Sequence, residues 1–248
     1  MKKVAHPNPL RPFWGLYVKE LTILLDSPIG YLVGIFFLGF SGVWFFLIQQ
    51  FFAADQASFR GYFGIFPLVF LLVIPSLTMR VWSEERKQGT FELLLTLPLS
   101  TFSLVGAKLS ALTTFFTFML VATLPVIFLV LPFGEFDAGP IVSQYLGSFL
   151  LGLSGLSLGQ FVSSKTSNQI SAFLITATVL MFFTLADGIG IWFSGTAVQR
   201  LFNLFSFQFR SSSFVRGIID TRDVLFFLLV TLGFFLLTIR SLEKEKWS

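Results

Sequence analysis

Six stretches of the chain contain no Asp, Glu, Lys or Arg: residues 27–54, 61–79, 109–134, 138–164, 166–186 and 224–239. A helix needs about 20 apolar residues to cross the roughly 30 Å hydrocarbon core of a bilayer, and five of the stretches are long enough. The last is short at 16 residues, but the charged side chains of Asp223 and Arg240 at its ends can extend to the membrane surface. The pattern predicts an all-α integral membrane protein with six transmembrane helices.

The spans are expected at about Ile29–Ile48, Tyr62–Met79, Leu109–Leu131, Ile141–Val162, Ile170–Ala186 and Val224–Ile239. Pro67 and Pro75 are expected to kink the second span. The sequence is expected to divide into three parts: a cytoplasmic tail with an interfacial helix (1–28), a six-span domain (29–240) and a cytoplasmic C-terminal tail (241–248).

The interfacial helix is expected at Phe13–Leu25, where apolar residues recur at helical spacing. Trp14 and Tyr17 within it are typical of a helix that lies in the membrane interface. Ser27 is placed to cap the first span, with Pro28 at the first helical position.

Composition excludes several kinds of site. The chain has no Cys, so a disulfide, a thiolate metal site and a cysteine nucleophile are excluded. The one histidine, His6, lies in a polar segment and cannot form a metal cluster alone. The phosphate-binding motif Gly-x-x-x-x-Gly-Lys-Ser/Thr is missing, so we expect no ATP site in this chain. No catalytic pair lies inside the predicted spans, which argues against an intramembrane enzyme.

Basic residues are distributed unevenly between the two sides of the predicted bundle. With an even number of spans, both termini share one side with the connection 80–108 and with Lys165. That side holds 12 Lys and Arg residues, and the other holds 5. The positive-inside rule therefore predicts that both termini face the cytoplasm. This placement accounts for the net charge of +4, so the charge gives no indication of nucleic-acid binding.

The fourth predicted span carries a stripe of small residues at 4-3-4 spacing: Ser148, Gly152, Gly155 and Gly159. Small residues let helix backbones approach closely in a membrane, where no hydrophobic force drives helices together. Two interpretations remain open. The stripe packs inside one six-helix bundle, or it forms a subunit interface.

The connection after the second span contains the cluster Glu84-Glu85-Arg86-Lys87, then Gly89-Thr90-Phe91-Glu92, and then Leu-rich sequence up to Pro98. This loop, with Gly106-Ala107-Lys108 after it, closely resembles the loop after the second span in ABC-2 type transporter permeases. Two further stretches resemble the branch that includes the gliding-motility-associated ABC permease subunit: Lys19-Glu20-Leu21 with Ser27-Pro28-Ile29-Gly30-Tyr31, and Ser213–Val224. The resemblance covers about residues 10 to 245.

The resemblance implies the permease subunit of an ABC transporter, an exporter in the inner membrane of a prokaryote. In this family a coupling helix after the second span docks on a separate ATPase. The residues carried over to that contact are Glu84, Glu85, Arg86, Gly89, Thr90 and Glu92. ATP and Mg would be bound by two ATPase subunits, and a second permease half, identical or related, would complete the transporter. The alternative is a membrane scaffold that anchors partner proteins and transports nothing.

The segment before the last span is both basic and aromatic on the side where positive charge is disfavoured. We expect it to form an outer gate or to bind an extracytoplasmic partner through Arg210, Arg216, Asp220, Arg222 and Asp223. Asp223 is also expected to cap the last span. The alternative is an interfacial hairpin that only seals the bundle.

Overall fold

The computed structural model describes residues 10–52, 58–96, 100–193 and 195–246. Lys2, Lys3, His6 and the rest of the expected N-terminal tail lie outside the described residues. The described chain is helical, and it contains no strand. Its helices are α1 (Leu10–Asp26), α2 (Pro28–Val43), η1 (Trp44–Ile48), α3 (Arg60–Gly64), α4 (Phe66–Thr78), α5 (Ser83–Gln88), α6 (Phe91–Thr96), α7 (Thr101–Val121), α8 (Leu124–Val130), η2 (Leu131–Phe133), α9 (Ala138–Ser164), α10 (Gln169–Ile191), α11 (Ala197–Phe205), α12 (Phe207–Val215) and α13 (Thr221–Lys246).

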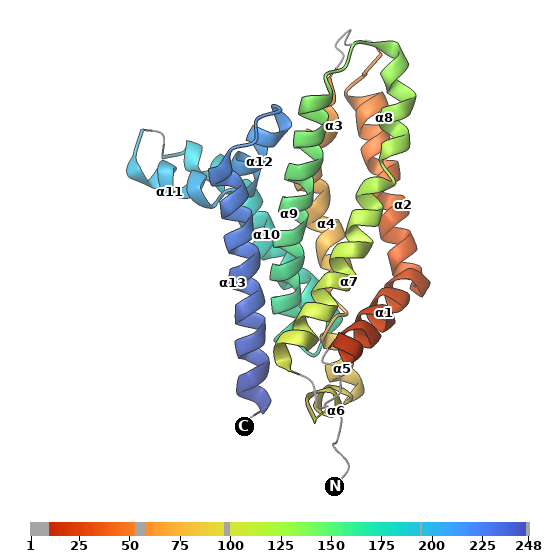
Figure 1. The fold of residues 1–248 in the computed structure, drawn as a ribbon. Coiled ribbons are helices and arrows are strands. Elements are labelled where there is room, and N and C mark those ends of the chain that lie inside the picture. The colour runs from red at the N-terminus through yellow and green to blue at the C-terminus, as the bar shows by residue number, and fades with distance from the viewer. Residues whose placement is uncertain (1–9, 53–57, 97–99, 194, 247–248) are drawn as a thin grey trace.

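Within the described residues, six helical segments are long and apolar enough to span a membrane: Pro28–Ile48, Phe66–Gln88, Thr101–Phe133, Ala138–Ser164, Gln169–Ile191 and Thr221–Lys246. The all-α architecture with six spans is confirmed. Both ends of the described chain lie at one end of the bundle (Figure 1). We call this the terminal end, and we call the opposite end, which carries α11 and α12, the distal end.

Helix α9 is the central element of the bundle and packs against α4, α7, α10, α12 and α13 (Figure 1). Its side chains are accordingly buried over most of its length. By contrast, most residues of α2 and α13 are partly or fully exposed, as expected of helices whose apolar faces contact lipid.

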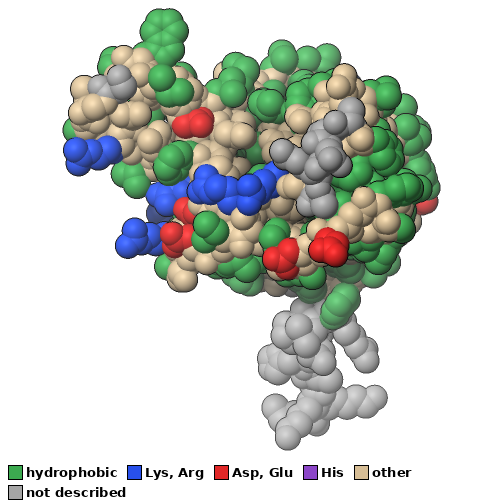
Figure 2. Space-filling view, turned by 90° about the horizontal axis from the view of Figure 1, so that it is seen from above, with side chains coloured by type: hydrophobic (Ala, Val, Ile, Leu, Met, Phe, Trp, Pro, Cys, Tyr) green, Lys and Arg blue, Asp and Glu red, His purple; other side chains and the backbone are tan. Residues whose placement is uncertain are grey.

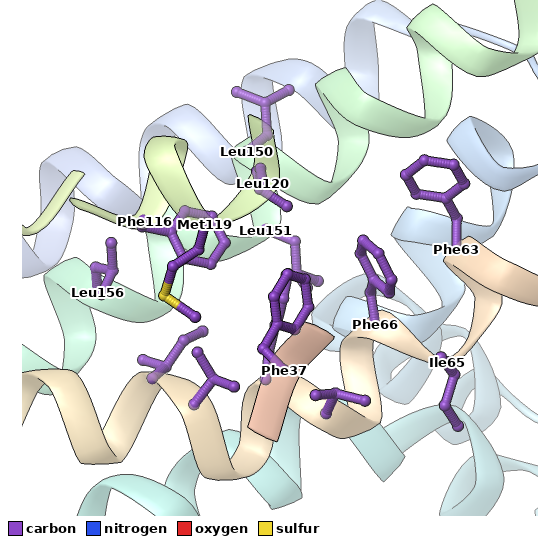
Figure 3. Packing of buried hydrophobic residues seen from close by; sticks show 14 of the residues in the cluster. Phe37, Phe63, Ile65, Phe66, Phe116, Met119, Leu120, Leu150, Leu151 and Leu156 are labelled. Carbon is purple, nitrogen blue, oxygen red and sulfur yellow. The ribbon is translucent and has the colours of Figure 1, made fainter. Parts of the chain in front are cut away.

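Aromatic side chains fill the core of the bundle. Phe37, Phe66, Phe70 and Phe116 are each at most 2% exposed. Figure 3 shows several of these rings packed with leucines of α7 and α9. Phe70 and Phe116 meet edge to face at 5.1 Å between ring centroids, a geometry that aromatic quadrupoles favour. Because lipid is itself apolar, such close packing is the main force that joins these helices.

Proline residues divide two of the expected spans. Pro67 stands at the start of α4, after a break that separates α4 from α3. Pro125 stands likewise at the start of α8, which separates from α7 at Ala122 and Thr123. At the second break the hydroxyl of Thr123 is hydrogen-bonded to the carbonyl of Leu120 and to Tyr145. A backbone interruption at membrane depth is thus buried and satisfied within the protein.

The first and last helices of the described chain, α1 and α13, are longer than expected. Helix α1 packs along α7 and ends at Asp26. Ser27 then caps α2 by accepting a hydrogen bond from Ile29 N, with Pro28 at the first position, as predicted. At the other end, α13 continues through residues 241–246, which we expected as a tail. Charged residues end a membrane span but not a helix, and the lysines of the last turn favour the helix C-terminus.

Candidate functional site

The predicted docking loop forms two short helices beneath the bundle at the terminal end (Figure 1). Between α5 and α6 stands Gly89, whose φ of 71° lies in the left-handed region. Its N–H bonds to the carbonyl of Arg86, and the next residue, Thr90, bonds back to the carbonyl of Glu85. Only a residue without a side chain adopts this conformation at low cost. The glycine in the predicted motif therefore shapes the turn between α5 and α6.

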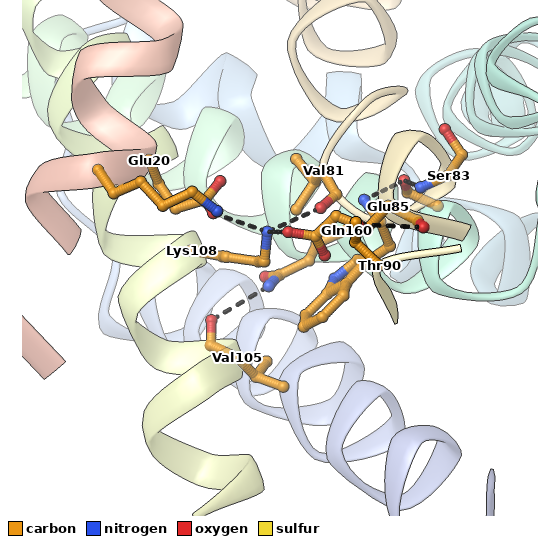
Figure 4. A network of polar contacts seen from close by, with 11 residues as sticks. Glu20, Val81, Ser83, Glu85, Thr90, Val105, Lys108 and Gln160 are labelled. Carbon is orange, nitrogen blue, oxygen red and sulfur yellow. Dashed lines mark hydrogen bonds and ion pairs between the residues drawn. The ribbon is translucent and has the colours of Figure 1, made fainter. Parts of the chain in front are cut away.

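A buried lysine joins this loop to two other helices. The ammonium of Lys108, on α7, lies 2.9 Å from Glu20 of α1 and 2.8 Å from Glu85 of α5. It also donates to the carbonyl of Val81 at 3.0 Å and lies 4.8 Å from the ring centroid of Trp82. The lysine side chain is 1% exposed. Figure 4 shows the three helices converging on this ammonium. We call Glu20, Glu85 and Lys108 the charge triad.

The charge triad carries a net charge of −1, with two carboxylates on one ammonium. Ion pairs taken out of water gain strength from the lower dielectric, but each charge pays a desolvation cost. Removing the ammonium alone would leave Glu20 with only the more distant Lys19, at 3.6 Å, and Glu85 without an ion-pair partner among the described residues. The relative positions of α1, α5 and α7 are therefore linked, so a displacement of α5 must displace α1 and α7 or break the triad.

Sequence reasoning did not identify Lys108 as a site residue. It counted Lys108 among the basic residues on the cytoplasmic side and within the family motif Gly106-Ala107-Lys108, without giving it a role. The available signal was its position, since it is the one charged residue between Glu92 and the long apolar run that begins at Leu109.

Arg86 makes a second contact from the loop to the bundle. Its guanidinium pairs with Glu245 at the end of α13 and stacks over the Phe91 ring at 4.0 Å. Two of the six predicted docking residues, Glu85 and Arg86, thus form ion pairs with other helices of their own chain. They hold the loop in place, and we do not assign them to a partner surface. Glu84 is half-buried, whereas Gly89, Thr90 and Glu92 are exposed beside Lys87 and Gln88.

The turn between α4 and α5 is bound to the central helix. The hydroxyl oxygen of Ser163, at the end of α9, accepts hydrogen bonds from the backbone N–H groups of Trp82 and Ser83. The same hydroxyl donates to the carbonyl of Met79. A separate hydrophobic cluster lies around this turn. Its buried members are Leu16, Trp82, Phe91, Leu104, Val105, Ala107, Ile239 and Leu242. The loop is therefore built onto the bundle as a fixed element.

The distal segment forms a pair of short helices, α11 and α12, beside the distal part of α10 (Figure 1). Arg210 of α12 pairs with Asp223 of α13 at 2.8 Å, and its guanidinium lies 5.1 Å from the Phe226 ring centroid. We call the pair of Arg210 and Asp223 the distal latch. Figure 2 shows basic and acidic side chains gathered on this end, with hydrophobic side chains around them.

The other residues predicted for the distal site, Arg216, Asp220 and Arg222, are not part of the distal latch. Arg216 hydrogen-bonds Ser212 of its own helix, and Arg222 is exposed. Asp223 was expected to cap the last span, but Asp220 does so instead. The carboxylate of Asp220 accepts a hydrogen bond from the backbone N–H of Arg222. Asp223 lies in the first turn of α13 and forms its ion pair with Arg210.

The small-residue stripe of α9 faces other helices of the same chain. A Cβ at Gly152 would lie 2.1 Å from Phe116 Cε1, one at Gly155 would lie 2.5 Å from Ile74, and one at Gly159 would lie 2.2 Å from Thr78. Ser148 is buried as well. Gly152, Gly155 and Gly159 therefore lie against α4 and α7 of the same chain.

No group of three or more His, Cys, Asp and Glu side chains that could hold a metal ion occurs among the described residues.

Comparison with protein families gives one result that bears on this geometry. A family model described as "ABC-2 family transporter protein" matches residues 41–247, which is most of the chain. The comparison with curated proteins gave no match.

Proposed function

Since the chain belongs to the ABC-2 family of transporter proteins, we propose that this permease component is driven by two copies of a separate ABC ATPase bound at its terminal end. ATP and Mg would be held by those subunits. The observation that carries the proposal is the fixed loop of α5 and α6. Its exposed residues are presented by a scaffold that the charge triad, the Arg86–Glu245 pair and Ser163 hold rigidly.

The docking surface of this proposal is Glu84, Lys87, Gln88, Gly89, Thr90 and Glu92. Closure of the ATPase pair on ATP binding would move α5, which would act as the coupling helix. The charge triad would pass that motion to α1 and α7 as a rigid-body tilt. A loop that moved independently of the bundle could not transmit such a motion. This loop is bound to α7, α9 and α13, and through Lys108 it is linked to α1.

The distribution of basic residues supports the orientation. By sequence, 12 of the 17 Lys and Arg residues fall in the segments assigned to the side of the two termini, so the positive-inside rule favours a cytoplasmic terminal end in a prokaryotic inner membrane. We propose export as the direction of transport. A second permease half, identical or related, would pair with this one, and the substrate path would run between the halves along α2, α4 and α10.

At the distal end, Arg210, Arg216, Asp220, Arg222 and Asp223 are proposed as part of an outer gate or as the contact for an extracytoplasmic partner. The distal latch supports a mechanical role for Arg210 and Asp223, and exposure leaves Arg216 and Arg222 available to a partner. The motifs at 19–31 and 213–224 support placement near the gliding-motility-associated permease branch.

Co-purification tests the proposal. We expect an ABC ATPase to co-purify with the wild-type chain in detergent. The double variant Lys87→Glu/Glu92→Lys reverses two exposed charges without changing the net charge. Because like charges brought together at an interface cost several kcal/mol, it should lose the ATPase.

The control Arg200→Glu/Glu135→Lys makes the same exchange at the distal end and should retain the ATPase. Equal recovery with both variants would contradict the docking surface. Absence of any ATPase from the wild-type preparation would favour the scaffold alternative.

A further inference from the structure

A cleft of about 810 Å³ lies at the terminal end, between α1 and the start of α2 on one side and the end of α4 with α5 on the other. The charge triad and Leu112 of α7 also line it. The cleft is large enough for the head group of a lipid and the beginning of its chains. Glu84, Gln88 and Thr90 of the proposed docking surface reach its lining, but ATPase docking does not account for the apolar part of the cleft.

The lining is divided by polarity at the level of the membrane boundary. The part contributed by the charge-free stretches of the spans includes the apolar Ile29, Leu77 and Leu112. The charged part comes from residues just beyond these stretches, among them Asp26, Arg80 and Glu84. Ile23, also in the lining, is 51% exposed. A ligand that fits both parts must be an amphiphile, with its apolar end directed into the bilayer.

The charges in the lining specify the head group further. Three basic and four acidic side chains line the cleft, so it carries a net charge of −1. An anionic phospholipid is drawn to basic pockets and is disfavoured here. Among the described residues, neither Asp26 nor Glu84 has an ion pair, and Arg80 hydrogen-bonds only the amide of Gln169. Carboxylates and a guanidinium therefore remain for a head group that has an ammonium and a phosphate.

The same lining distinguishes between two kinds of ammonium. Quaternary ammonium groups such as choline are recognised by aromatic rings. None of the described residues that line the cleft is aromatic. A primary ammonium instead donates hydrogen bonds, which carboxylates accept in strong charge-assisted contacts. Because the described lining of the cleft has carboxylates and no aromatic ring, it favours a head group with a primary ammonium over one with a quaternary ammonium.

We propose that this cleft binds a membrane phospholipid with a primary-amine head group, of the phosphatidylethanolamine class, from the leaflet at the terminal end. The ammonium contacts Asp26 and Glu84, the phosphate contacts Arg80, and the acyl chains leave along α2 and α4. The bound lipid fills the space between α1 and α5, the two helices that Lys108 links.

The test is native mass spectrometry of the full-length chain, released from detergent in an equimolar mixture of phosphatidylethanolamine, phosphatidylcholine and phosphatidylglycerol with identical acyl chains. We expect one phosphatidylethanolamine to be retained in preference to the other two. Loss of one charge-assisted hydrogen bond lowers affinity roughly tenfold, so Asp26→Asn/Glu84→Gln should reduce the preference over phosphatidylcholine by at least that factor. The control Glu135→Gln/Glu243→Gln removes the same charge from exposed positions outside the cleft and should keep the preference.

A second measurement locates the lipid in the wild-type chain. Phosphatidylethanolamine with a photoreactive group near the glycerol should cross-link to residues 23–30 more than a phosphatidylcholine with the same group. Equal retention of the three lipids, full preference in the Asp26/Glu84 variant, or equal cross-linking by both probes would each overturn the proposal. Because Glu84 also belongs to the proposed docking surface, the lipid is measured on the chain without the ATPase. Failure of lipid binding would leave docking through Lys87 and Glu92 untouched, and failure of docking would leave the lipid site intact.

Discussion

At the scale of single residues, Lys108 has the largest expected effect because its ammonium is the only cation in contact with both Glu20 and Glu85 among the described residues. Lys108→Met keeps the length of the side chain and removes the charge. Removing one partner of a buried ion pair costs about 3–5 kcal/mol. We expect a marked fall in the melting temperature of the purified protein, measured by scanning fluorimetry. The exposed Lys165, replaced in the same way, is the control and should show little change. Similar melting temperatures for both variants would contradict the role given to the triad.

Gly152 tests close packing at the scale of one methyl group. Gly152→Ala would place a Cβ 2.1 Å from a ring carbon of Phe116, and overpacking of this kind costs about 1–3 kcal/mol. Gly39 lies in α2 with no atom within 4 Å of a Cβ built there, so Gly39→Ala should be neutral or slightly stabilising. The double variant Gly152→Ala/Phe116→Leu should recover part of the lost thermal stability. If Gly152→Ala melts like Gly39→Ala, the stripe is not close-packed.

At the scale of helices, the distal latch holds α12 against α13. Asp223→Asn removes the charge from a carboxylate that is largely buried with Arg210, and α12 should detach more often. We expect faster hydrogen–deuterium exchange in residues 207–215, with no change in α4. Arg216→Gln is the matched control, because Arg216 is exposed and bonds only within its own helix. Unchanged exchange in the Asp223 variant would show that the ion pair does not hold α12.

Helices were predictable where the residues that define them are neighbours in the sequence. The absence of charge located the six spans, and Ser27-Pro28 located the start of the first. The end of α13 was missed because Arg240, Glu243 and Lys244 are charged, and charge marks the membrane boundary but not the end of a helix. The partners of Glu85 and Arg86 were also missed. They lie 23 and 159 positions away along the chain, and no local pattern connects residues at such separations.

At the scale of the whole molecule, the two ends of the bundle differ in construction. The terminal end has a second hydrophobic cluster and three polar attachments around one loop, whereas the segment of α11 and α12 at the distal end is held by one ion pair among the described residues. This asymmetry is what a permease requires if force enters at one end and a gate opens at the other. The loop of α5 and α6 could be located from its motif, but its attachment becomes visible only when α7, α9 and α13 are brought together.

The most direct test of this account uses a single cysteine at Gln88→Cys in a chain that has no other Cys. A membrane-impermeant thiol reagent should fail to label it from outside intact cells. In inside-out vesicles it should label the cysteine without the ATPase and be blocked when the ATPase is bound. Ile218→Cys at the distal end should show the reverse accessibility, with no dependence on the ATPase. Labelling of residue 88 from outside intact cells, or equal labelling in vesicles with and without the ATPase, would contradict docking at the terminal end.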